Sequence, residues 1–349
     1  MSIETGRRLA LIDASGSPYD VGVMLGRFGR AAAHRHLITT HGWASVMAHR
    51  DDPFVVHMRE MTEALLPGCW QELRGLAFGL ELPFDDVFLW NCRGEVRALV
   101  PDGCTTVQVP GRAPVIAHNE DGDPGLRGFC AIAQVRPAQG KAFNTFVYPA
   151  SMPGHTFAVT ETGLVQAVNN IRPRHVGPGL PRMLLGRAVL DCATLDDALR
   201  LIGTARRAGA FHFTLAQRGD GRLVGVEFTH KSCSVTTVAA MACHANHLVH
   251  ESMAGEPQSI TGSSAARQRR GDEIIGAGKS DPLAILWDTG NKVLPVYRTQ
   301  SDDPDDENTL ATALFEIGAE AVGWRVFDRA GTAPRFGFED LAALPLVTG

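Results

Sequence analysis

The stretch Pro101–Pro110, "PDGCTTVQVP", joins a cysteine to an alternating run that is typical of a β-strand. Gly103 precedes Cys104, and two threonines follow it. A thiol is a good acyl acceptor once a base removes its proton, but the spacing singles out none of the 13 histidines as that base. If the Gly103–Cys104 bond is cut, the new α-amino group, with a pKa of about 8, is itself a suitable base. A glycine before the cysteine leaves the carbonyl unshielded for this attack. The residues alone leave two interpretations open: a buried structural thiol, and a nucleophile that cleaves the bond before it.

The pattern of the chain changes at this stretch. Before it, the sequence predicts a helix that begins near Ser17, two more that are separated at Pro67-Gly68, and a short one after Pro83. After it, short β-like segments alternate with Gly, Pro and Asn/Asp turns as far as residue 248. A helix pair over 178–204, with Thr194 as an N-cap, interrupts them, and another helix is predicted after residue 260. This order favours an α+β fold with mostly antiparallel sheets, helices on the outside and a single domain over 1–349.

The composition is that of an ordinary globular protein, with 44% hydrophobic and 20% charged residues in 349. A net charge of −5 gives no reason to expect a nucleic-acid partner. No signal peptide is evident at the start, and no apolar run approaches the roughly 18 residues that span a bilayer. We therefore expect no membrane association and a cytoplasmic location. The seven cysteines are scattered and odd in number, which argues against a disulfide framework.

Motifs for metals and cofactors are incomplete. "GAGKS" over 276–280 lacks the first glycine of a phosphate loop, because Glu273 occupies that position. The stretch "CHANHLVH" over 243–250 fits no common zinc spacing, and "HNEDGDPG" over 118–125 lacks the final glutamate of an EF-hand. We expect no metal and no cofactor.

Several motifs together resemble a known family. "DGCTT" at Cys104 resembles the nucleophile segment of the acyl-coenzyme A:6-aminopenicillanic acid acyltransferase (isopenicillin N acyltransferase) family, a group of N-terminal nucleophile hydrolases related to bile salt hydrolases and penicillin V acylases. Five further segments resemble the family's motifs in the family's order: "HNEDG" (118–122), "TETGLVQAVNNI" (160–171), "CHANHL" (243–248), "SSAARQRR" (263–270) and "ENTLATALFEI" (307–317).

The resemblance implies a four-layer αββα sandwich that is made as an inactive precursor. Cys104 would attack the Gly103 carbonyl, an N-to-S shift would give a thioester, and water would free the new N-terminus. The products, an α fragment, 1–103, and a β fragment, 104–349, would stay packed together. Cys104 would then be the nucleophile, with its own α-amine as the base.

The resemblance also implies roles for individual residues. Asp121 matches the carboxylate that holds the new amine, and Asn246 matches the side-chain amide of the oxyanion hole. Arg267 matches an arginine whose charge would favour the thiolate. Four more residues are expected to support the substrate, the oxyanion or the self-cleavage step: Asn119, Asn170, Thr105 and Thr309. Asn169 leaves the register of Asn170 ambiguous.

Two departures from the family's pattern stand in the Asn-x-Asp loop. Gly122 follows the loop where many relatives have an aromatic residue, and Glu120 occupies its middle position. We expect these residues to open or acidify the pocket entrance, so that penicillin substrates do not carry over.

The function that we expect is a self-processing cysteine amidohydrolase that cleaves the C–N bond of a small N-acyl amide through an acyl-thioester. An acyl-CoA-dependent N-acyltransferase acting on a small amine is the first alternative, and an inert binding protein on the same scaffold is the second. The partners are then a small N-acyl amide or acyl-CoA and the two fragments of one precursor. The identity of the acyl group and the amine, and the formation of a homo-oligomer, stay open.

Overall fold

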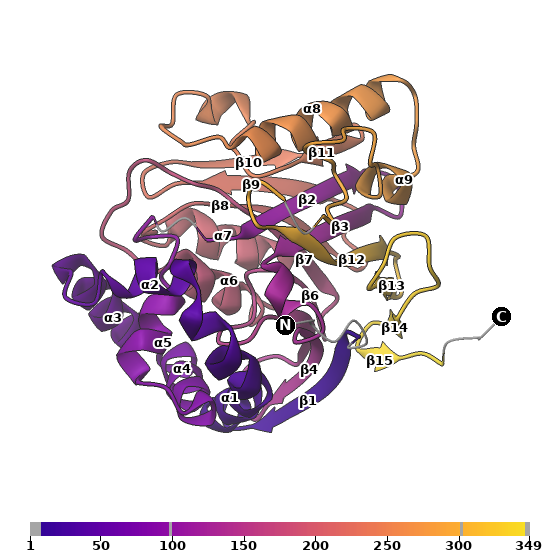
Figure 1. Ribbon diagram of the computed structural model, residues 1–349. Coiled ribbons are helices and arrows are strands. Elements are labelled where there is room, and N and C mark those ends of the chain that lie inside the picture. Colours follow the sequence, from indigo (N-terminus) through magenta and orange to yellow (C-terminus); the bar gives the residue numbers. More distant parts are fainter. Residues whose placement is uncertain (1–7, 98–99, 301–302, 346–349) are drawn as a thin grey trace.

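Two β-sheets form the centre of the protein in this computed structural model, which describes residues 8–97, 100–300 and 303–345 (Figure 1). The first sheet has the order β1-β4-β5-β6-β7-β8-β9-β10, and the second has the order β11-β2-β3-β12-β13-β14-β15. The strands of the first sheet are β1 (Ala10–Gly16), β4 (Ala131–Pro137), β5 (Phe143–Val147), β6 (Phe157–Thr160), β7 (Leu164–Asn170), β8 (Phe211–Gln217), β9 (Leu223–Phe228) and β10 (Cys233–Thr237). Those of the second sheet are β2 (Asp102–Val109), β3 (Val115–Gly122), β11 (Ala242–His244), β12 (Asn308–Ile317), β13 (Val322–Phe327), β14 (Phe336–Glu339) and β15 (Ala342–Ala343).

Helices cover the outer faces of both sheets. They are α1 (Pro18–Arg35), α2 (His41–Met47), α3 (Pro53–Leu65), α4 (Pro67–Leu80), α5 (Phe84–Trp90), α6 (Arg182–Val189), α7 (Leu195–Thr204), α8 (Gly262–Gly276) and α9 (Pro282–Leu286), with 3-10 turns at Leu37–Thr39, Pro124–Leu126 and Glu251–Met253. Ser17 and Thr194 cap α1 and α7 with side-chain hydrogen bonds, as the sequence predicts. Pro67 begins α4 two residues after α3 ends, because a proline fits the first turn of a helix but not its interior.

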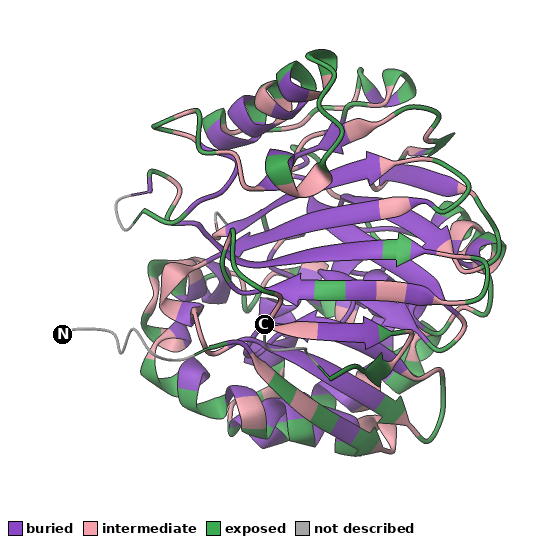
Figure 2. Ribbon diagram, turned by 90° about the vertical axis from the view of Figure 1, so that its right-hand side faces the viewer, coloured by how far each residue is buried: buried purple, intermediate pink, exposed green. Residues whose placement is uncertain are grey.

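The apolar clusters show four layers. The helices α1–α5 pack on Ala131, Ala133 and Val135 of β4, and α6 and α7 pack on β7–β9. The inner faces of the two sheets meet through residues such as Phe157 and Phe315. On the far side, α8 and α9 pack on β2, β3 and β12. Figure 2 shows the result, with buried strands at the centre and exposed residues on the outer helices. The predicted αββα sandwich is confirmed.

The sequence analysis missed two parts of the sheets. Strand β1 pairs in parallel with β4, while every other pairing between named strands is antiparallel. The region after β12 continues the second sheet as β13–β15, for which no strands were predicted. Every helix in the described part of the chain is too short or too polar to cross a membrane.

Candidate active site

Cys104 lies near the start of β2, where it is 2% exposed and its thiol is free. Strand β2 pairs with β3 on one side and with β11 on the other. In the β2–β3 register, Gly103 lies opposite Asp121 and Cys104 lies opposite Glu120. The "DGCTT" and "HNEDG" segments are therefore adjacent strands of one sheet, which explains why their residues gather at one place.

The backbone of Cys104 is held by Asn246 and Arg267. The Cys104 N–H donates to Asn246 Oδ1 at 3.0 Å, and Arg267 donates to the Cys104 carbonyl and, at 2.8 Å, to Thr105 Oγ1. Arg267 also donates to Asn246 Oδ1 at 2.6 Å. Because a guanidinium group and an amide N–H can only donate, these contacts fix the Asn246 oxygen toward them and its amide nitrogen away. Nδ2 donates one hydrogen to the Asn170 carbonyl at 3.0 Å, and its second hydrogen has no partner among the hydrogen bonds of the described residues.

Asn170 is the asparagine of the 169–170 pair that reaches the cysteine. Its Nδ2 donates to the carbonyl of Asp102 at 3.0 Å, and its backbone hydrogen-bonds the Cys104 side chain. Asn169 instead accepts from Thr106 at 2.7 Å and from His212 at 3.0 Å. The register that the sequence left ambiguous is thereby resolved, because neighbouring residues of a strand point to opposite faces.

Asp121 is fully buried, and only one of its two carboxylate oxygens has a hydrogen-bond partner among the described residues. Thr309 Oγ1 donates to Asp121 Oδ1 at 2.7 Å, so the structure brings these two predicted residues together. The other carboxylate oxygen, Oδ2, has no hydrogen-bond partner in the part of the chain that the structure describes. A buried carboxylate oxygen without a donor is costly, and it marks a place where a donor such as an amine would be stabilised.

Glu307 and Arg298 fix the residues before the cysteine, and the sequence analysis did not assign them. The Asp102 N–H donates to Glu307 Oε1 at 3.0 Å, and Arg298 donates to Glu307 Oε2 at 2.6 Å. A Cβ at Gly103 would overlap the Glu307 carboxylate, so glycine is required for this close approach. Glu307 begins the "ENTLATALFEI" segment, but only the pairing of β12 with β3 shows that it lies beside Gly103.

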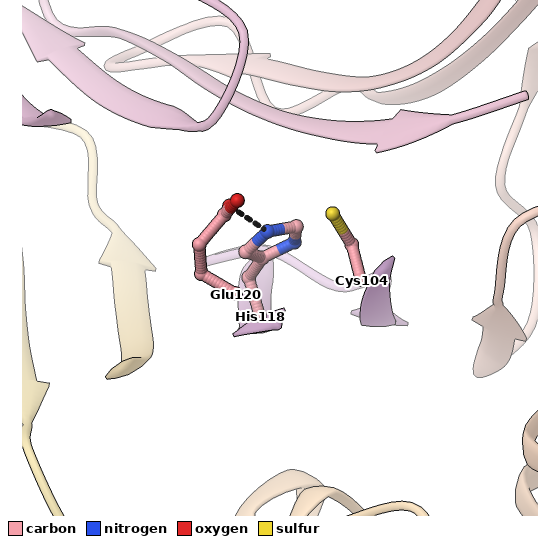
Figure 3. Close-up of side chains that lie close together, drawn as sticks. All are labelled: Cys104, His118 and Glu120. Atoms are coloured by element: carbon pink, nitrogen blue, oxygen red, sulfur yellow. Dashed lines mark hydrogen bonds and ion pairs between the residues drawn. The ribbon is translucent and has the colours of Figure 1, made fainter. Parts of the chain in front are cut away.

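His118 and Glu120 lie on the same face of the sheet as Cys104 (Figure 3). One ligand atom of each of the three side chains lies within 4.8 Å of the other two. His118 Nε2 is 3.1 Å from Glu120 Oε2, and Nδ1 is 2.8 Å from Thr106 Oγ1. The Thr106 hydroxyl donates to Asn169, so its oxygen accepts from His118 Nδ1–H and the proton of the imidazole is on Nδ1. The bond between Nε2 and Glu120 then needs one shared proton.

Burial sets the protonation of these groups. It raises the pKa of Glu120 well above the ordinary value, and it lowers the pKa of His118 to about 3. Both directions place the shared proton on Glu120, which gives a neutral pair. Burial, the largest cause, and the nearby carboxyl groups also raise the pKa of the Cys104 thiol well above its ordinary value. The Cys104 side chain of the intact chain is therefore a thiol at neutral pH.

The expectation that Arg267 favours the thiolate concerns the cleaved protein and stays a prediction, since the intact chain favours the thiol. The guanidinium group contacts the Cys104 carbonyl and Asn246 and so positions the backbone. Asn119 is not brought to Cys104. It shares a face of β3 with Asp121, but it donates to the Leu286 carbonyl at 2.7 Å and accepts from Thr312 at 2.7 Å, so its amide is engaged with other partners.

The expectation for the pocket entrance was wrong. A Cβ at Gly122 would lie 2.7 Å from the Tyr148 hydroxyl, so the aromatic ring of Tyr148 fills the space that Gly122 leaves. Tyr148 donates to Glu120 at 2.9 Å. Glu120 is 1% exposed and therefore does not acidify the entrance.

A thiolate, an imidazole and a carboxylate form a donor set that Zn²⁺ accepts, so Cys104, His118 and Glu120 could hold such an ion. Within the described ranges, no other group of three such side chains converges in this way. The histidines of the 243–250 stretch have separate partners: His244 contacts Glu227, His247 contacts Ser264 and His250 contacts Ser234.

Two cavities flank Asp102. The first has a volume of about 690 Å³. Its lining includes Trp90 of α5, Tyr148 after β5 and Glu307 just before β12. The second, of about 620 Å³, is lined by arginines together with Asn170. Arg93, Val100, Asp102 and Arg172 line both.

The sequence model of the acyl-coenzyme A:6-aminopenicillanic acid acyl-transferase family matches residues 108–329. The chain belongs to this family. The matched residues make up more than half of the chain and include Asp121, Asn170, Asn246 and Arg267, although they begin just after Cys104. Acyl-transferase family members are enzymes, so the chain is an enzyme of the acyltransferase and amidohydrolase type. A search of the curated proteins found no match to the chain.

Proposed function

We propose that the protein is a self-processing amidohydrolase that uses Cys104 as an N-terminal nucleophile on a small N-acyl amide. The observation that carries this proposal is the surroundings of the Gly103–Cys104 bond. The Cys104 nitrogen is held by Asn246, an unpartnered oxygen of Asp121 lies across from Gly103, and Asn246 has a free N–H. These groups match the needs of an acyl transfer, which are a bound amine, a nucleophile and a donor for the oxyanion.

Self-cleavage would begin with transfer of the thiol proton to a base. In the intact chain the Cys104 nitrogen is an amide that donates to Asn246, so it cannot serve. The neighbouring pair of His118 and Glu120 is the base that we assign to this step, because it lies within reach of the thiol and becomes a proton acceptor when Glu120 loses its proton.

The sulfur would then attack the Gly103 carbonyl. The C–N bond to Cys104 breaks, the nitrogen takes up a proton and a thioester forms. Water hydrolyses the thioester to give the Gly103 carboxylate and the free thiol of Cys104. The new α-ammonium group lies near Asp121, whose open oxygen would accept its hydrogen bond.

Turnover would use the same atoms on an external amide. The α-amine takes the thiol proton, the sulfur attacks the amide carbonyl, and the oxyanion receives the second N–H of Asn246. The α-ammonium group returns its proton to the nitrogen of the substrate, which leaves as an amine. Water then hydrolyses the thioester and releases the acid. The ammonium group that forms when the amine takes the proton stabilises the neighbouring thiolate, which lowers the pKa of the thiol relative to the intact chain.

An acyltransferase is the second candidate, and the description of the matched family favours it. The two reactions share the acyl-thioester and differ only in whether water or an amine accepts the acyl group. Incubation with acyl-CoA and a small amine decides between them: amide formation faster than hydrolysis would establish the transferase.

The decisive experiment for the proposed function is intact-mass analysis with a Cys104→Ala variant. We expect the wild-type protein to give two fragments that meet at Gly103–Cys104, and the variant to give one chain without amidase activity. Cys192→Ala, at a half-buried free cysteine between α6 and α7, is the matched control and should still be cleaved. Full amidase activity in Cys104→Ala, or an uncut wild-type chain that is active, would exclude the proposal.

A further inference from the structure

The second cavity beside Asp102 is an arginine pocket, which we define by its five lining arginines: Arg93, Arg97, Arg172, Arg174 and Arg182. Asp102 is the one carboxylate among the residues that line it. Behind the lining, Glu307 lies 3.6 Å from Arg172, and Glu95 accepts from the Arg182 backbone, so the net positive charge is smaller than five. A pocket of about 620 Å³ that stays positively charged is suited to an anion.

Arg93 and Arg182 are held rigidly at the pocket wall. They are 4% and 3% exposed. Arg182 donates to the carbonyls of Ile171 at 2.7 Å and Ala210 at 2.9 Å, and Arg93 lies over the ring of Trp90. These contacts already fix each guanidinium group. The two arginines would therefore lose little side-chain entropy when a ligand binds.

The two arginines also have donors to spare. Nε of Arg93 and Nε of Arg182 are buried without a hydrogen-bond partner in the described part of the chain. Their ion pairs with Asp102 are loose, at 3.6 Å and 3.8 Å, which is beyond hydrogen-bond length. Asp102 therefore neutralises part of the charge and leaves these buried donors unsatisfied.

The position of Asp102 in the chain indicates which part of a substrate the pocket receives. Cys104 attacks the carbonyl of Gly103, so Asp102 belongs to the acyl side of the bond that is cut. Its carboxylate is separated from that carbonyl by about five bonded atoms, a reach of roughly two residues. Asp102 is thus the acidic part of the first acyl group that the nucleophile would take.

We propose that the arginine pocket binds a carboxylate on the acyl group of the external substrate, in the place that the Asp102 side chain occupies before cleavage. This inference rests on the proposed function, because it names the substrate class of the same site. An acyl chain with a terminal carboxylate about five atoms from the scissile carbonyl, such as a pimeloyl group, has the required length.

The test compares two p-nitroanilides that differ only in charge, pimeloyl and its monomethyl ester. We expect the purified, processed enzyme to hydrolyse the free acid with a kcat/KM roughly ten- to hundredfold higher, mainly through KM, as for a charged hydrogen bond. In Arg93→Gln this ratio should fall toward one. Arg172→Gln, at a half-buried position, gives the same test if the first variant does not fold. Arg112→Gln, in the exposed turn between β2 and β3, is the control and should keep the ratio.

Two further measurements separate the outcomes. Equal hydrolysis of the two anilides would overturn this inference and leave the proposed function standing. Calorimetric binding of pimelate, but not of its monomethyl ester, without hydrolysis of either anilide would overturn the proposed function alone. The enzyme could instead prefer octanoyl-CoA over the octanoyl thioester of N-acetylcysteamine, and lose this preference in Arg93→Gln. This result would place the anion on the leaving group and overturn the inference.

Discussion

Replacement of Asn246 by aspartate tests the oxyanion donor while it keeps the rest of the site. The Asn246 oxygen accepts from the Cys104 N–H and from Arg267, and an aspartate oxygen can accept both bonds. Arg267, at 2.6 Å, compensates the new charge, so we expect the variant to fold. What changes is the amide nitrogen, whose one hydrogen goes to Asn170 and whose other we assign to the oxyanion. Aspartate places an oxygen there that cannot donate.

The expected loss follows from that one donor. Removal of a single oxyanion donor lowers kcat by about 10²–10³, or about 2.7–4 kcal/mol of transition-state stabilisation. The assay is kcat for amide hydrolysis, normalised to the processed fraction that intact mass reports. Repulsion between the new oxygen and the Asn170 carbonyl adds to the loss and does not offset it. A kcat within threefold of the wild-type value would refute the assignment of Asn246 as the oxyanion donor.

Three other perturbations have defined outcomes. Glu120→Gln should slow self-cleavage roughly hundredfold, since a general base contributes at least this much. In the wild type the rate should rise as pH passes the raised pKa of Glu120, because the pair must lose a proton before it can accept one; a time course of intact mass after synthesis should lack this rise in the variant. Thr309→Val removes the donor to Asp121 and should lower the free energy of unfolding by about 1–3 kcal/mol in urea, whereas Thr332→Val in an exposed loop should stay within about 0.5 kcal/mol. Gly103→Ala should block self-cleavage, because its Cβ would displace the Glu307 carboxylate; normal fragments by intact mass would contradict this reasoning.

Local chemistry made much of the fold predictable. The caps at Ser17 and Thr194 and the break at Pro67 depend on neighbouring residues, and the structure has them where the sequence indicates. Strand β1 was not predictable in this way. The segment is too short to show a clear alternation of apolar and polar residues. Its partner, β4, lies more than a hundred residues later in the chain.

The residues of the candidate site likewise fall into those that sequence motifs predict and those that only the three-dimensional pairing reveals. Motif order placed Asp121, Asn246 and Thr309 near Cys104, and the structure brings them there. Asn119 lies on the same face of β3 as Asp121 but bonds to Leu286 and Thr312, and no sequence pattern reports these partners. Glu307 accepts a hydrogen bond from Asp102, although the two residues lie about two hundred positions apart in the sequence. Only the pairing of the strands in the sheet reveals this contact.

The unsatisfied groups around the Gly103–Cys104 bond are groups that the proposed cleavage and the proposed substrate would satisfy. Folded proteins pair nearly all of their buried polar atoms, and each unpaired one raises the free energy of the fold. Here an oxygen of Asp121, the side-chain oxygen of Asn170 and the Nε atoms of Arg93 and Arg182 are all buried without partners in the described residues. The two oxygens lack donors, and the two nitrogens lack an acceptor. Cleavage would create an ammonium group beside Asp121, and a carboxylated acyl group would supply an acceptor for the arginines. The same groups that are unfavourable in the intact chain would then be satisfied by the product of the proposed cleavage and by the proposed substrate.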